Sequence, residues 1–327
     1  MKKRVFSGAR PTGRQHLGNY LGAIRNYVKL QDEYDCIYSI VDLHALTTME
    51  ETGRLRDNVR EMMLDWLAAG LDPERSILFV QSHVPEVAEL HVLLSMLTPL
   101  GWLLRVPTFK EKARHQPQNV NYGLVGYPVL MTSDIALYKA EVIPVGEDQV
   151  PHLELAREIV RRFNQLFGAV FPEPQPRLTE YPQLVGLDGS QKMSKSYNNQ
   201  IEICATPEET QHRVLAAVTD PARRFRTDVG HPEVCNVYAL QRFFSEAKLE
   251  EIARRCRCAD IGCVACKHLL ADGINEALAP FRARRAELAA KPDLVDEIAT
   301  EGARRARGIA RETLLEVKDK MGLPIAR

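Results

Sequence analysis

Apolar residues in the first half of the chain fall into two patterns that alternate along the sequence. Short continuous apolar runs predict strands at residues 3–7, 36–41, 76–80 and 141–145. Longer stretches with apolar residues every three or four positions predict helices at residues 16–30, 55–69 and 154–167. Gly70 follows the second of these helices and is its expected C-cap. This alternation favours an α/β fold, a Rossmann-type doubly wound parallel sheet.

The pattern changes twice further along the chain. Residues 85–138 have helical spacing with an irregular stretch, which we interpret as an insertion in the sheet domain. A second change begins at Thr206, which can cap a helix with Pro207 at its first position and Glu209 closing a capping box. From there to the end we find helical spacing and no convincing strand. We therefore predict a Rossmann domain over residues 1–200 and an all-helical domain over residues 201–327, whose last helix packs back on the first domain.

Composition adds little to this picture. The 327 residues are 45% hydrophobic and 26% charged, which is ordinary for a soluble globular protein. Lys plus Arg and Asp plus Glu both number 43, so the net charge says nothing about partners. The basic start of the chain is not followed by the apolar segment of a signal peptide, and no stretch has the length of a transmembrane helix. We expect a cytoplasmic protein with reduced cysteines.

The lysine loop, which we define as residues 192–196, carries the first candidate chemistry. Lys192 and Lys195 lie three positions apart with Ser194 between them and Ser196 after them. Ammonium groups, serine hydroxyls and loop amides are suited to phosphoryl oxygens. The same spacing also describes an ordinary solvated turn, so the loop by itself does not decide the function.

A second candidate site follows the first predicted strand. Glycines at positions 8, 13 and 18 permit close approach to the backbone, and His16 and Asn19 lie near the start of a predicted helix. Helix N-termini and exposed amides favour phosphate, so a nucleotide is a plausible ligand here. A histidine next to a glycine is more often a packing or capping residue, and this signal alone is weak.

Taken together, the two stretches resemble a known pair. His16-Leu17-Gly18-Asn19 and residues 192–196 are similar to the HIGH and KMSKS signatures of class I aminoacyl-tRNA synthetases, the second letter for letter. Residues 40–47, 109–112 and 145–149 also resemble that family and occur in its order. The resemblance covers almost the whole chain and points to the bacterial tryptophan enzymes. It implies a homodimer that activates L-tryptophan with ATP and transfers it to tRNA(Trp), with the helical domain binding the anticodon.

The resemblance also implies the residues that bind ATP. His16 and Asn19 are expected at the phosphates and ribose, and Lys192 and Lys195 at the departing pyrophosphate, with Mg²⁺ assisting. Lys112 is expected as a third cation on the phosphates. The further ATP-binding residues that it implies are Gly8, Arg10, Pro11, Thr12, Gly18, Gly146, Asp148, Met193 and Ser194. Arg10 stands where many tryptophan enzymes carry glutamine, so its contribution stays open.

Residues 127–134 resemble the specificity helix of the tryptophan enzymes. The resemblance implies that Asp134 accepts the indole N–H and that Met131 packs on the ring. Indole offers one donor and no acceptor, so a fixed carboxylate is complementary to it. Core packing is the alternative for Met131 and Tyr127, and helix capping is the alternative for Asp134. The other tryptophan-binding residues that the resemblance implies are Phe6, His44, Tyr127 and Gln149.

Five of the seven cysteines gather in the predicted helical domain, at positions 235, 256, 258, 263 and 266. Cys263 and Cys266 form a C-x₂-C pair, and with Cys256 and Cys235 they can offer four thiolates to Zn²⁺ or to a [4Fe–4S] cluster. Spacing alone does not choose between the metals. The cysteine pattern resembles that of the subgroup of tryptophan enzymes with an iron–sulfur cluster, and this resemblance implies [4Fe–4S]. Zinc and unliganded thiols stay as alternatives.

Arginines in the second half of the chain are candidates for tRNA phosphate contacts, although neighbouring acidic residues make a solvated helix face equally reasonable for any one of them. They are arginines 223, 224, 226, 282, 284, 285, 304, 305, 307 and 311. Two other functions remain as alternatives, a tyrosine enzyme of the same architecture and a non-catalytic regulator that binds tryptophan or RNA. Loss of His16 or of the lysine loop would mark the regulator, and both are present.

Overall fold

The computed structural model describes residues 2–49, 51–106, 109–110, 113–114, 117–178 and 184–325. It divides into two compact units that interleave along the chain. The sheet unit comprises Met1–Gly13, Tyr27–Glu180 and Lys291–Arg327, and the helical unit comprises Arg14–Asn26 and Tyr181–Ala290. The predicted domain limits at residue 200 stay a prediction.

Five parallel strands form one sheet in the described part of the sheet unit, in the order β3-β2-β1-β4-β5. They are β1 (Arg4–Ala9), β2 (Asp35–Ile40), β3 (Ser76–Val80), β4 (Val142–Val145) and β5 (Gln175–Leu178). The predicted α/β fold with a Rossmann-type sheet is confirmed. The fifth strand was not predicted, because its sequence Gln-Pro-Arg-Leu is polar and contains a proline. An edge strand tolerates this composition.

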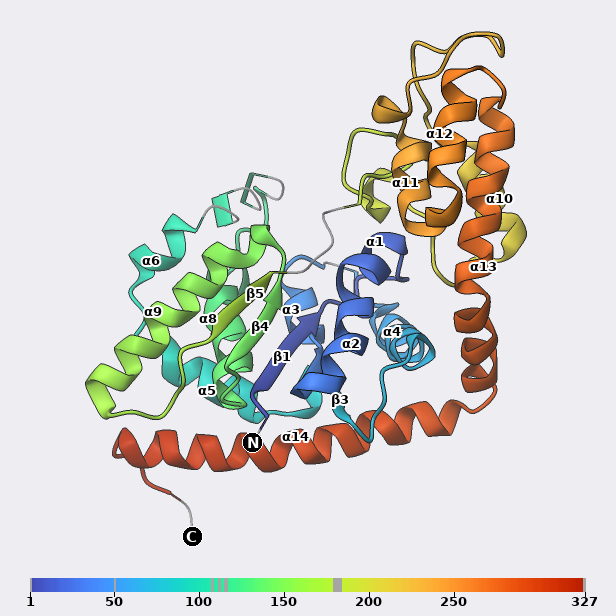
Figure 1. Cartoon of the computed structure of the whole chain (residues 1–327). Coiled ribbons are helices and arrows are strands. Elements are labelled where there is room, and N and C mark those ends of the chain that lie inside the picture. Colours follow the sequence, from blue (N-terminus) through green and yellow to red (C-terminus); the bar gives the residue numbers. More distant parts are fainter. Residues whose placement is uncertain are drawn as a thin grey trace. The chain divides into compact units, whose positions relative to one another are not determined.

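Helices cover both faces of this sheet, as Figure 1 shows with α8 and α9 on one side of the strands and α2 and α4 on the other. Among the described residues, the helices of this part of the chain are α2 (Arg25–Glu33), α3 (Asp42–Leu46), α4 (Leu55–Ala69), α5 (Glu86–Ser95), α6 (Leu100–Arg105), α8 (Tyr122–Leu137) and α9 (Val150–Phe167). The predicted C-cap at Gly70 is confirmed, since its φ of 109° is left-handed and glycine adopts it without strain.

Alternate strand residues supply the two cores. On one face Phe6 and Ile37 join a buried cluster with residues of α5, α8 and α9. On the other face the ring of Tyr38 stacks on that of Tyr27 with their centroids 4.6 Å apart, and Trp66 of α4 meets Tyr27 edge-on. A strand that is buried on both faces reads as a continuous apolar run, which is why these strands were visible in the sequence.

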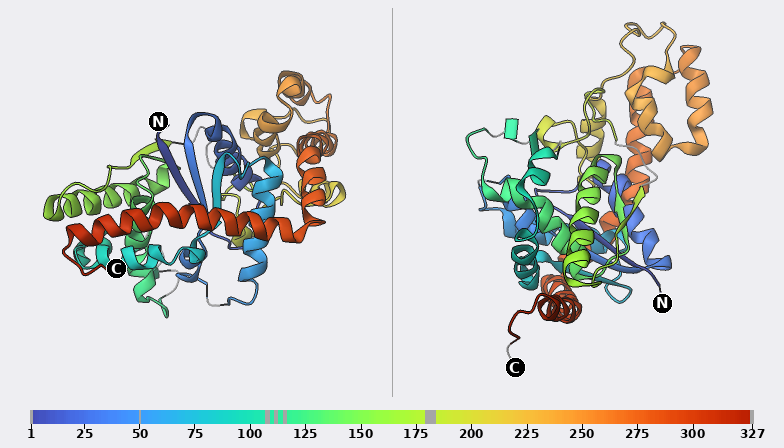
Figure 2. Two further views of the ribbon diagram at one scale, coloured as in Figure 1. Left: turned by 90° about the horizontal axis from the view of Figure 1, so that it is seen from below. Right: turned by 90° about the vertical axis from the view of Figure 1, so that its left-hand side faces the viewer.

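The long helix α14 (Pro292–Lys320) belongs to the sheet unit and packs against β3 and α5, as was predicted for the last helix. Figure 2 shows it in red beside the strands. Gly302 permits the approach, because a Cβ at that position would lie 1.8 Å from the carbonyl oxygen of Leu78. The guanidinium groups of Arg307 and Arg311 donate to the carboxylate of Glu86 at 3.0 Å. These two arginines therefore anchor the helix in this structure.

The helical unit is built around α10 (Pro207–Leu215), α11 (Asn236–Phe244), α12 (Leu249–Arg257) and α13 (Cys263–Ala289). It also holds the short α1 (Leu17–Asn19) and a π-helical turn, η1 (Tyr20–Ile24). The capping box of α10 is confirmed, because Thr206 Oγ1 accepts from the Glu209 amide and Glu209 Oε2 accepts from the Thr206 amide. Among the described helices, none combines the length and the apolar character needed to cross a membrane.

Candidate active site

The lysine loop ends a hairpin in the helical unit. Val185 and Lys192 form an antiparallel bridge, and the Met193 amide donates to the Leu184 carbonyl at 2.8 Å. The turn between the two arms includes Gly189, whose φ of 72° is left-handed. The hairpin fixes the start of the loop, and the last two residues of the loop begin the short 3₁₀ helix η4 (Lys195–Tyr197).

A buried amide, Asn199, holds the loop from within. Its Nδ2 donates to Asp188 Oδ2 at 3.0 Å and to the Lys192 carbonyl at 3.2 Å, while its Oδ1 accepts from the Ser194 amide at 2.8 Å. The residue is only 2% exposed. Gly186 leaves room for it, because a Cβ there would come within 2.1 Å of the Asn199 amide nitrogen. The backbone on which both lysines stand is thus set by a residue outside the motif.

Some side chains of the loop anchor it to the unit, and others are accessible to solvent. Met193 is buried at 1% exposure and fixes the loop on the unit. Ser194 Oγ accepts from the Ser196 amide at 3.2 Å. Lys192 is exposed and Lys195 is half-buried. The loop therefore carries two lysine side chains on a backbone that the hairpin and Asn199 hold in place.

His16 lies in the same unit as the lysine loop, and both lysines of the loop influence its pKa. Residues next to it pair with the segment after the loop, since the Leu17 amide donates to the Ile201 carbonyl at 2.9 Å and the Ile203 amide donates to the Gln15 carbonyl at 3.1 Å. Burial, followed by the positive charges of Lys195 and Lys192, lowers the pKa of His16 to about 4. The imidazole is therefore neutral at physiological pH.

Gly18 and Asn19 complete this corner of the helical unit. A Cβ on Gly18 would lie 3.0 Å from the His16 ring and 3.6 Å from Met193 Cβ, so the glycine permits close contact with the loop. Asn19 Oδ1 accepts from the His16 amide at 3.1 Å. The structure thus brings together His16, Gly18, Asn19 and the lysine loop, four elements that the sequence analysis had joined only by resemblance.

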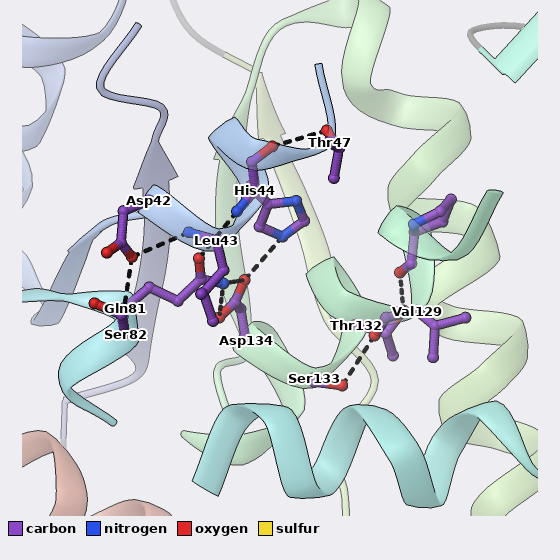
Figure 3. Close-up of polar contacts among 11 residues, drawn as sticks. Asp42, Leu43, His44, Thr47, Gln81, Ser82, Val129, Thr132, Ser133 and Asp134 are labelled. Atoms are coloured by element: carbon purple, nitrogen blue, oxygen red, sulfur yellow. Dashed lines mark hydrogen bonds and ion pairs between the residues drawn. The ribbon is translucent and has the colours of Figure 1, made fainter. Parts of the chain in front are cut away.

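A second cluster of predicted residues lies in the sheet unit and is drawn in Figure 3. Asp134, on α8, is 2% exposed. Its carboxylate accepts from Gln81 Nε2 at 2.9 Å and 2.8 Å through its two oxygens. Oδ2 also pairs with His44 Nε2 at 3.1 Å. The Gln81 side chain further accepts from the His44 amide at 3.3 Å, which closes a three-residue network.

Two members of this network follow the carboxyl ends of neighbouring strands. His44 lies on α3 directly after β2, and Gln81 begins the 3₁₀ turn after β3. Asp42 fastens the two connections together, because its Oδ1 accepts from the amides of Leu43 and Ser82, both at 3.0 Å. Ligands of doubly wound folds bind outside the carboxyl ends of the strands, and the network lies at that edge.

The rest of the predicted tryptophan residues also belong to the sheet unit. Tyr127 is buried, and its hydroxyl hydrogen-bonds His152 Nε2 on α9. Met131 is partly buried against the core, and the ring of Phe6 stacks on Tyr138. A cavity of about 250 Å³ lies between α3 and α8, lined among others by Leu43, Thr47, His91, Asn121, Tyr127 and Leu130. It lies beside the predicted specificity helix, because Tyr127 and Leu130 of its lining belong to α8.

The remaining predicted ATP residues have mixed surroundings. A Cβ on Gly8 would lie 2.7 Å from Val41 Cγ1, so the glycine allows the strand end to pack closely. Arg10 Nη1 donates to Thr48 Oγ1 at 3.4 Å, and the Thr12 amide donates to the Arg10 carbonyl next to the buried Pro11. Gln149 Nε2 donates to Asp148 Oδ2 at 3.0 Å, in a 3₁₀ turn that begins after Gly146. Lys112 lies outside the described residues.

The predicted cysteine ligands lie in the helical unit, near the ends of three helices. Burial, followed by the neighbouring thiol of Cys235, raises the pKa of Cys266 to about 11, and Cys256 and Cys263 also contribute. The four thiols are therefore within electrostatic range of one another. Among the described residues, however, no group of three or more His, Cys, Asp or Glu side chains is placed to hold a metal ion. The expected metal cluster is not supported by this arrangement and stays a prediction.

Three functional candidates were missed in the sequence. Gln81 and Asn199 are ordinary amides with no motif of their own, and His152 reads as part of an amphipathic helix. The only available signal was position, since Gln81 comes directly after a strand and Asn199 three residues after the lysine loop. Their hydrogen-bond partners are either residues distant in the sequence or main-chain atoms. No local sequence pattern therefore marks these three residues.

Comparisons with known proteins agree with this geometry. The family described as tRNA synthetases class I (W and Y) matches residues 1–279. A tryptophan–tRNA ligase of Thermotoga maritima is 44% identical, covering 98% of this chain and 99% of its own length. One of Aquifex aeolicus is 40% identical, covering 98% of this chain and 100% of its own.

A solved structure gives the same result. The tryptophanyl-tRNA synthetase of Campylobacter jejuni, complexed with ADP and tryptophan, matches with a TM-score of 0.90 at 34% identity, covering 98% of this chain and 100% of that one. The chain therefore belongs to the class I tRNA synthetases of the tryptophan and tyrosine type. Within that class it belongs to the family of tryptophan–tRNA ligases.

Proposed function

We propose that this chain activates L-tryptophan with ATP and transfers it to tRNA(Trp). The chain is an enzyme, an aminoacyl-tRNA synthetase. The observation that carries the choice of amino acid is its 40% and 44% identity to tryptophan–tRNA ligases over nearly their whole length. The packing of His16, Gly18 and the lysine loop within one unit, where a Cβ on Gly18 would contact both the His16 ring and Met193, supports the choice of ATP chemistry.

The first step is adenylate formation. A tryptophan carboxylate oxygen attacks the α-phosphorus of ATP, the bond from that phosphorus to the α,β-bridging oxygen breaks, and pyrophosphate leaves. Lys192 and Lys195 stabilise the charge that develops on the leaving group. Neutral His16 donates a hydrogen bond to a phosphate without adding charge, and Asn19 and Lys112 are assigned to the same ligand. Mg²⁺ supplies further neutralisation of the phosphates when bound.

The second step is transfer. The terminal ribose hydroxyl of the tRNA attacks the carbonyl carbon of the adenylate, the bond from this carbon to the phosphate oxygen breaks, and AMP leaves. The hydroxyl proton passes to the departing phosphate. Neither step needs a strong protein acid or base, since the leaving groups are phosphates. Catalysis then consists of positioning and electrostatic stabilisation.

Selection of tryptophan is assigned to the network of Asp134, Gln81 and His44. Asp134 is fixed by both partners and keeps lone pairs for the indole N–H. A phenylalanine side chain would leave that acceptor without its donor, which is costly in a buried site. Phe6, Tyr127 and Met131 are assigned to packing on the ring, and Gln149 to the amino acid's backbone.

Tryptophan-dependent and tyrosine-dependent ATP–pyrophosphate exchange tests this assignment. We expect exchange with tryptophan and none above background with tyrosine. Exchange with tyrosine instead would favour the tyrosine enzyme, and no exchange with either would favour a non-catalytic regulator. Light scattering on the purified chain tests the proposed homodimer, and its mass would equal one chain if that part were wrong. We also propose that the enzyme works in the cytoplasm.

The cysteines are proposed to hold a [4Fe–4S] cluster, with Zn²⁺ as the alternative. The donor set is suitable, because Cys235, Cys256, Cys263 and Cys266 are four thiols of one unit, and four thiolates are what either centre takes. N–H donors also face two of the sulfurs, Arg223 Nη1 at 3.8 Å from Cys256 Sγ and Gln241 Nε2 at 3.9 Å from Cys266 Sγ. Against the proposal, the thiols do not form a ligand group as they stand. Ligation would therefore require them to move closer.

Anaerobic purification with metal analysis tests this part. We expect brown protein with about four iron atoms per chain, and loss of the colour in Cys266→Ala but not in Cys258→Ala. Colourless protein with one zinc per chain would overturn the iron assignment. Colourless protein without metal would favour free thiols.

A further inference from the structure

An exposed aromatic ring stands on the helical unit between α10 and α11. We define the arginine loop as residues 220–231, which contain Arg223, Arg224, Phe225 and Arg226. Phe225 is 72% exposed and is the only phenylalanine among the exposed large hydrophobic side chains of the described residues. Nothing in the proposed activation chemistry uses it. The question is what such a ring does in water.

Hydrogen bonds from one buried carboxylate close the base of the arginine loop. Asp220 Oδ1 accepts from the Ala222 amide at 2.9 Å, and its Oδ2 accepts from the His231 amide at 2.8 Å. The same oxygen pairs with His231 Nδ1 at 2.9 Å. Opening the loop would leave the buried carboxylate of Asp220 without hydrogen-bond donors, which is costly, so the base of the arginine loop is fixed.

The tip of the loop is fixed as well. Asp228 Oδ2 accepts from the amides of Arg224 at 3.0 Å and Phe225 at 2.7 Å. Arg223 Nη2 donates to the Arg226 carbonyl at 3.1 Å. Gly230 donates through its amide to the Cys256 carbonyl at 3.0 Å. Phe225 is therefore held out on an ordered backbone and loses little freedom when something covers it.

Charge indicates the kind of partner. Phe225 lies between Arg224 and Arg226 in the sequence, and both arginines are exposed, so the loop that carries the ring also carries two exposed cationic side chains. An aromatic ring beside cations is the surface that unpaired nucleotides favour, with the base stacked on the ring and the flanking phosphates near the arginines. An apolar protein partner would not require the cations.

We propose that Phe225 is a stacking platform for an unpaired base of the tRNA, with Arg224 and Arg226 on the adjacent phosphates. The inference rests on the proposed function, because it takes tRNA to be a substrate. It assigns a single base contact to a residue that takes no part in amino-acid activation. Asp220 and Asp228 act as positioning residues that hold the platform.

Replacement of the ring tests the proposal. Phe225→Ala is expected to raise the KM for tRNA about tenfold or more in aminoacylation, since stacking on an aromatic side chain is a large contribution per base. Phe225→Tyr keeps a stacking face and is expected to stay within about twofold of wild type. Leu166→Ala, which removes another exposed apolar side chain, on α9, is the control and is expected to change nothing.

A second readout reports stacking directly. Phe225→Trp places an indole at the platform, and we expect its fluorescence to be quenched when tRNA is added without tryptophan. The wild-type titration corrects for the two natural tryptophans. No quenching, together with an unchanged KM for Phe225→Ala, overturns the proposal. A change in molecular mass for Phe225→Ala, with tRNA binding unaffected, would instead assign the ring to a protein contact.

The proposed function fails separately. Tryptophan-dependent pyrophosphate exchange needs no tRNA, and we expect it to be equal in wild type and in all Phe225 variants. If exchange is absent in the wild type, the assigned reaction is wrong. If exchange is normal and the tRNA readouts do not move, only the platform is wrong.

Discussion

The lysine loop and the Asp134 network are built in opposite ways. In the lysine loop Lys192 is exposed and Lys195 is half-buried, and a buried amide, Asn199, holds the backbone that carries them. In the network the charged group itself is buried, and Gln81 and His44 hold its carboxylate directly. The first arrangement suits a charge that appears only during reaction. The second suits a ligand with one fixed donor.

This difference indicates which site contributes to the reaction rate and which contributes to the choice of amino acid. Lysine ammonium groups bind any polyphosphate, so their contribution is to rate. A buried acceptor with fixed partners penalises every ligand that lacks the matching donor, so its contribution is to selection. Substitutions in the two regions should therefore separate the rate of activation from the choice of amino acid.

Lys195→Ala should have the largest effect. We expect the rate constant for tryptophan activation to fall about 10²- to 10³-fold, because a donor to the leaving pyrophosphate is lost. The KM for tryptophan should stay within about twofold. Pyrophosphate exchange measures both, with the exposed Lys248→Ala as the control. Equal losses in rate and in amino-acid discrimination would contradict the separation of roles.

Asn199→Ala should come next. It removes the acceptor of the Ser194 amide and the donor to the Lys192 carbonyl. We expect activation to fall between about 10- and 100-fold, since the lysines lose their fixed backbone. The free energy of unfolding should fall by about 1 to 3 kcal/mol. Single-turnover kinetics and chemical denaturation measure the two. Wild-type activation in this variant would show that the loop does not depend on the clamp.

Asp134→Ala should chiefly change selection. Gln81 and His44 lose their shared partner, and the preference for tryptophan over phenylalanine in kcat/KM should fall about tenfold or more. Activation at saturating tryptophan should fall less than in Lys195→Ala. Competitive exchange assays give the ratio, with the exposed Glu158→Ala as the control. A preserved preference would return Asp134 to a structural role.

The smallest effect concerns the pKa of His16. Its folded value of about 4 lies below the ordinary value of 6.5, so the folded state binds fewer protons between these limits. Stability contributed by neutral His16 is complete above about pH 6.5 and is lost as pH falls towards 4. Histidine NMR titration should show this low pKa, and Lys195→Ala should raise it by removing a neighbouring positive charge. An unchanged pKa in that variant would mean that burial acts alone.

Much of the fold could be predicted because its signals are local. Buried strands such as β2 and β3 are continuous apolar runs, and the start of α10 carries its own capping box in Thr206 and Glu209. Strand β5 escaped prediction because an edge strand is only partly buried and needs no apolar run. Its place is set by pairing with β4, which is a contact between distant residues.

The candidate site shows the same division. The sequence by itself determined the chemical groups: the lysine pair, His16, Asp134 and the cysteines. Only the tertiary structure decided their partners, the pairing of Gln81 with Asp134, the Asn199 clamp and the depressed pKa of His16. The physical reason is that a side chain's identity is local, whereas its burial, hydrogen bonds and electrostatic surroundings depend on segments that meet only after folding.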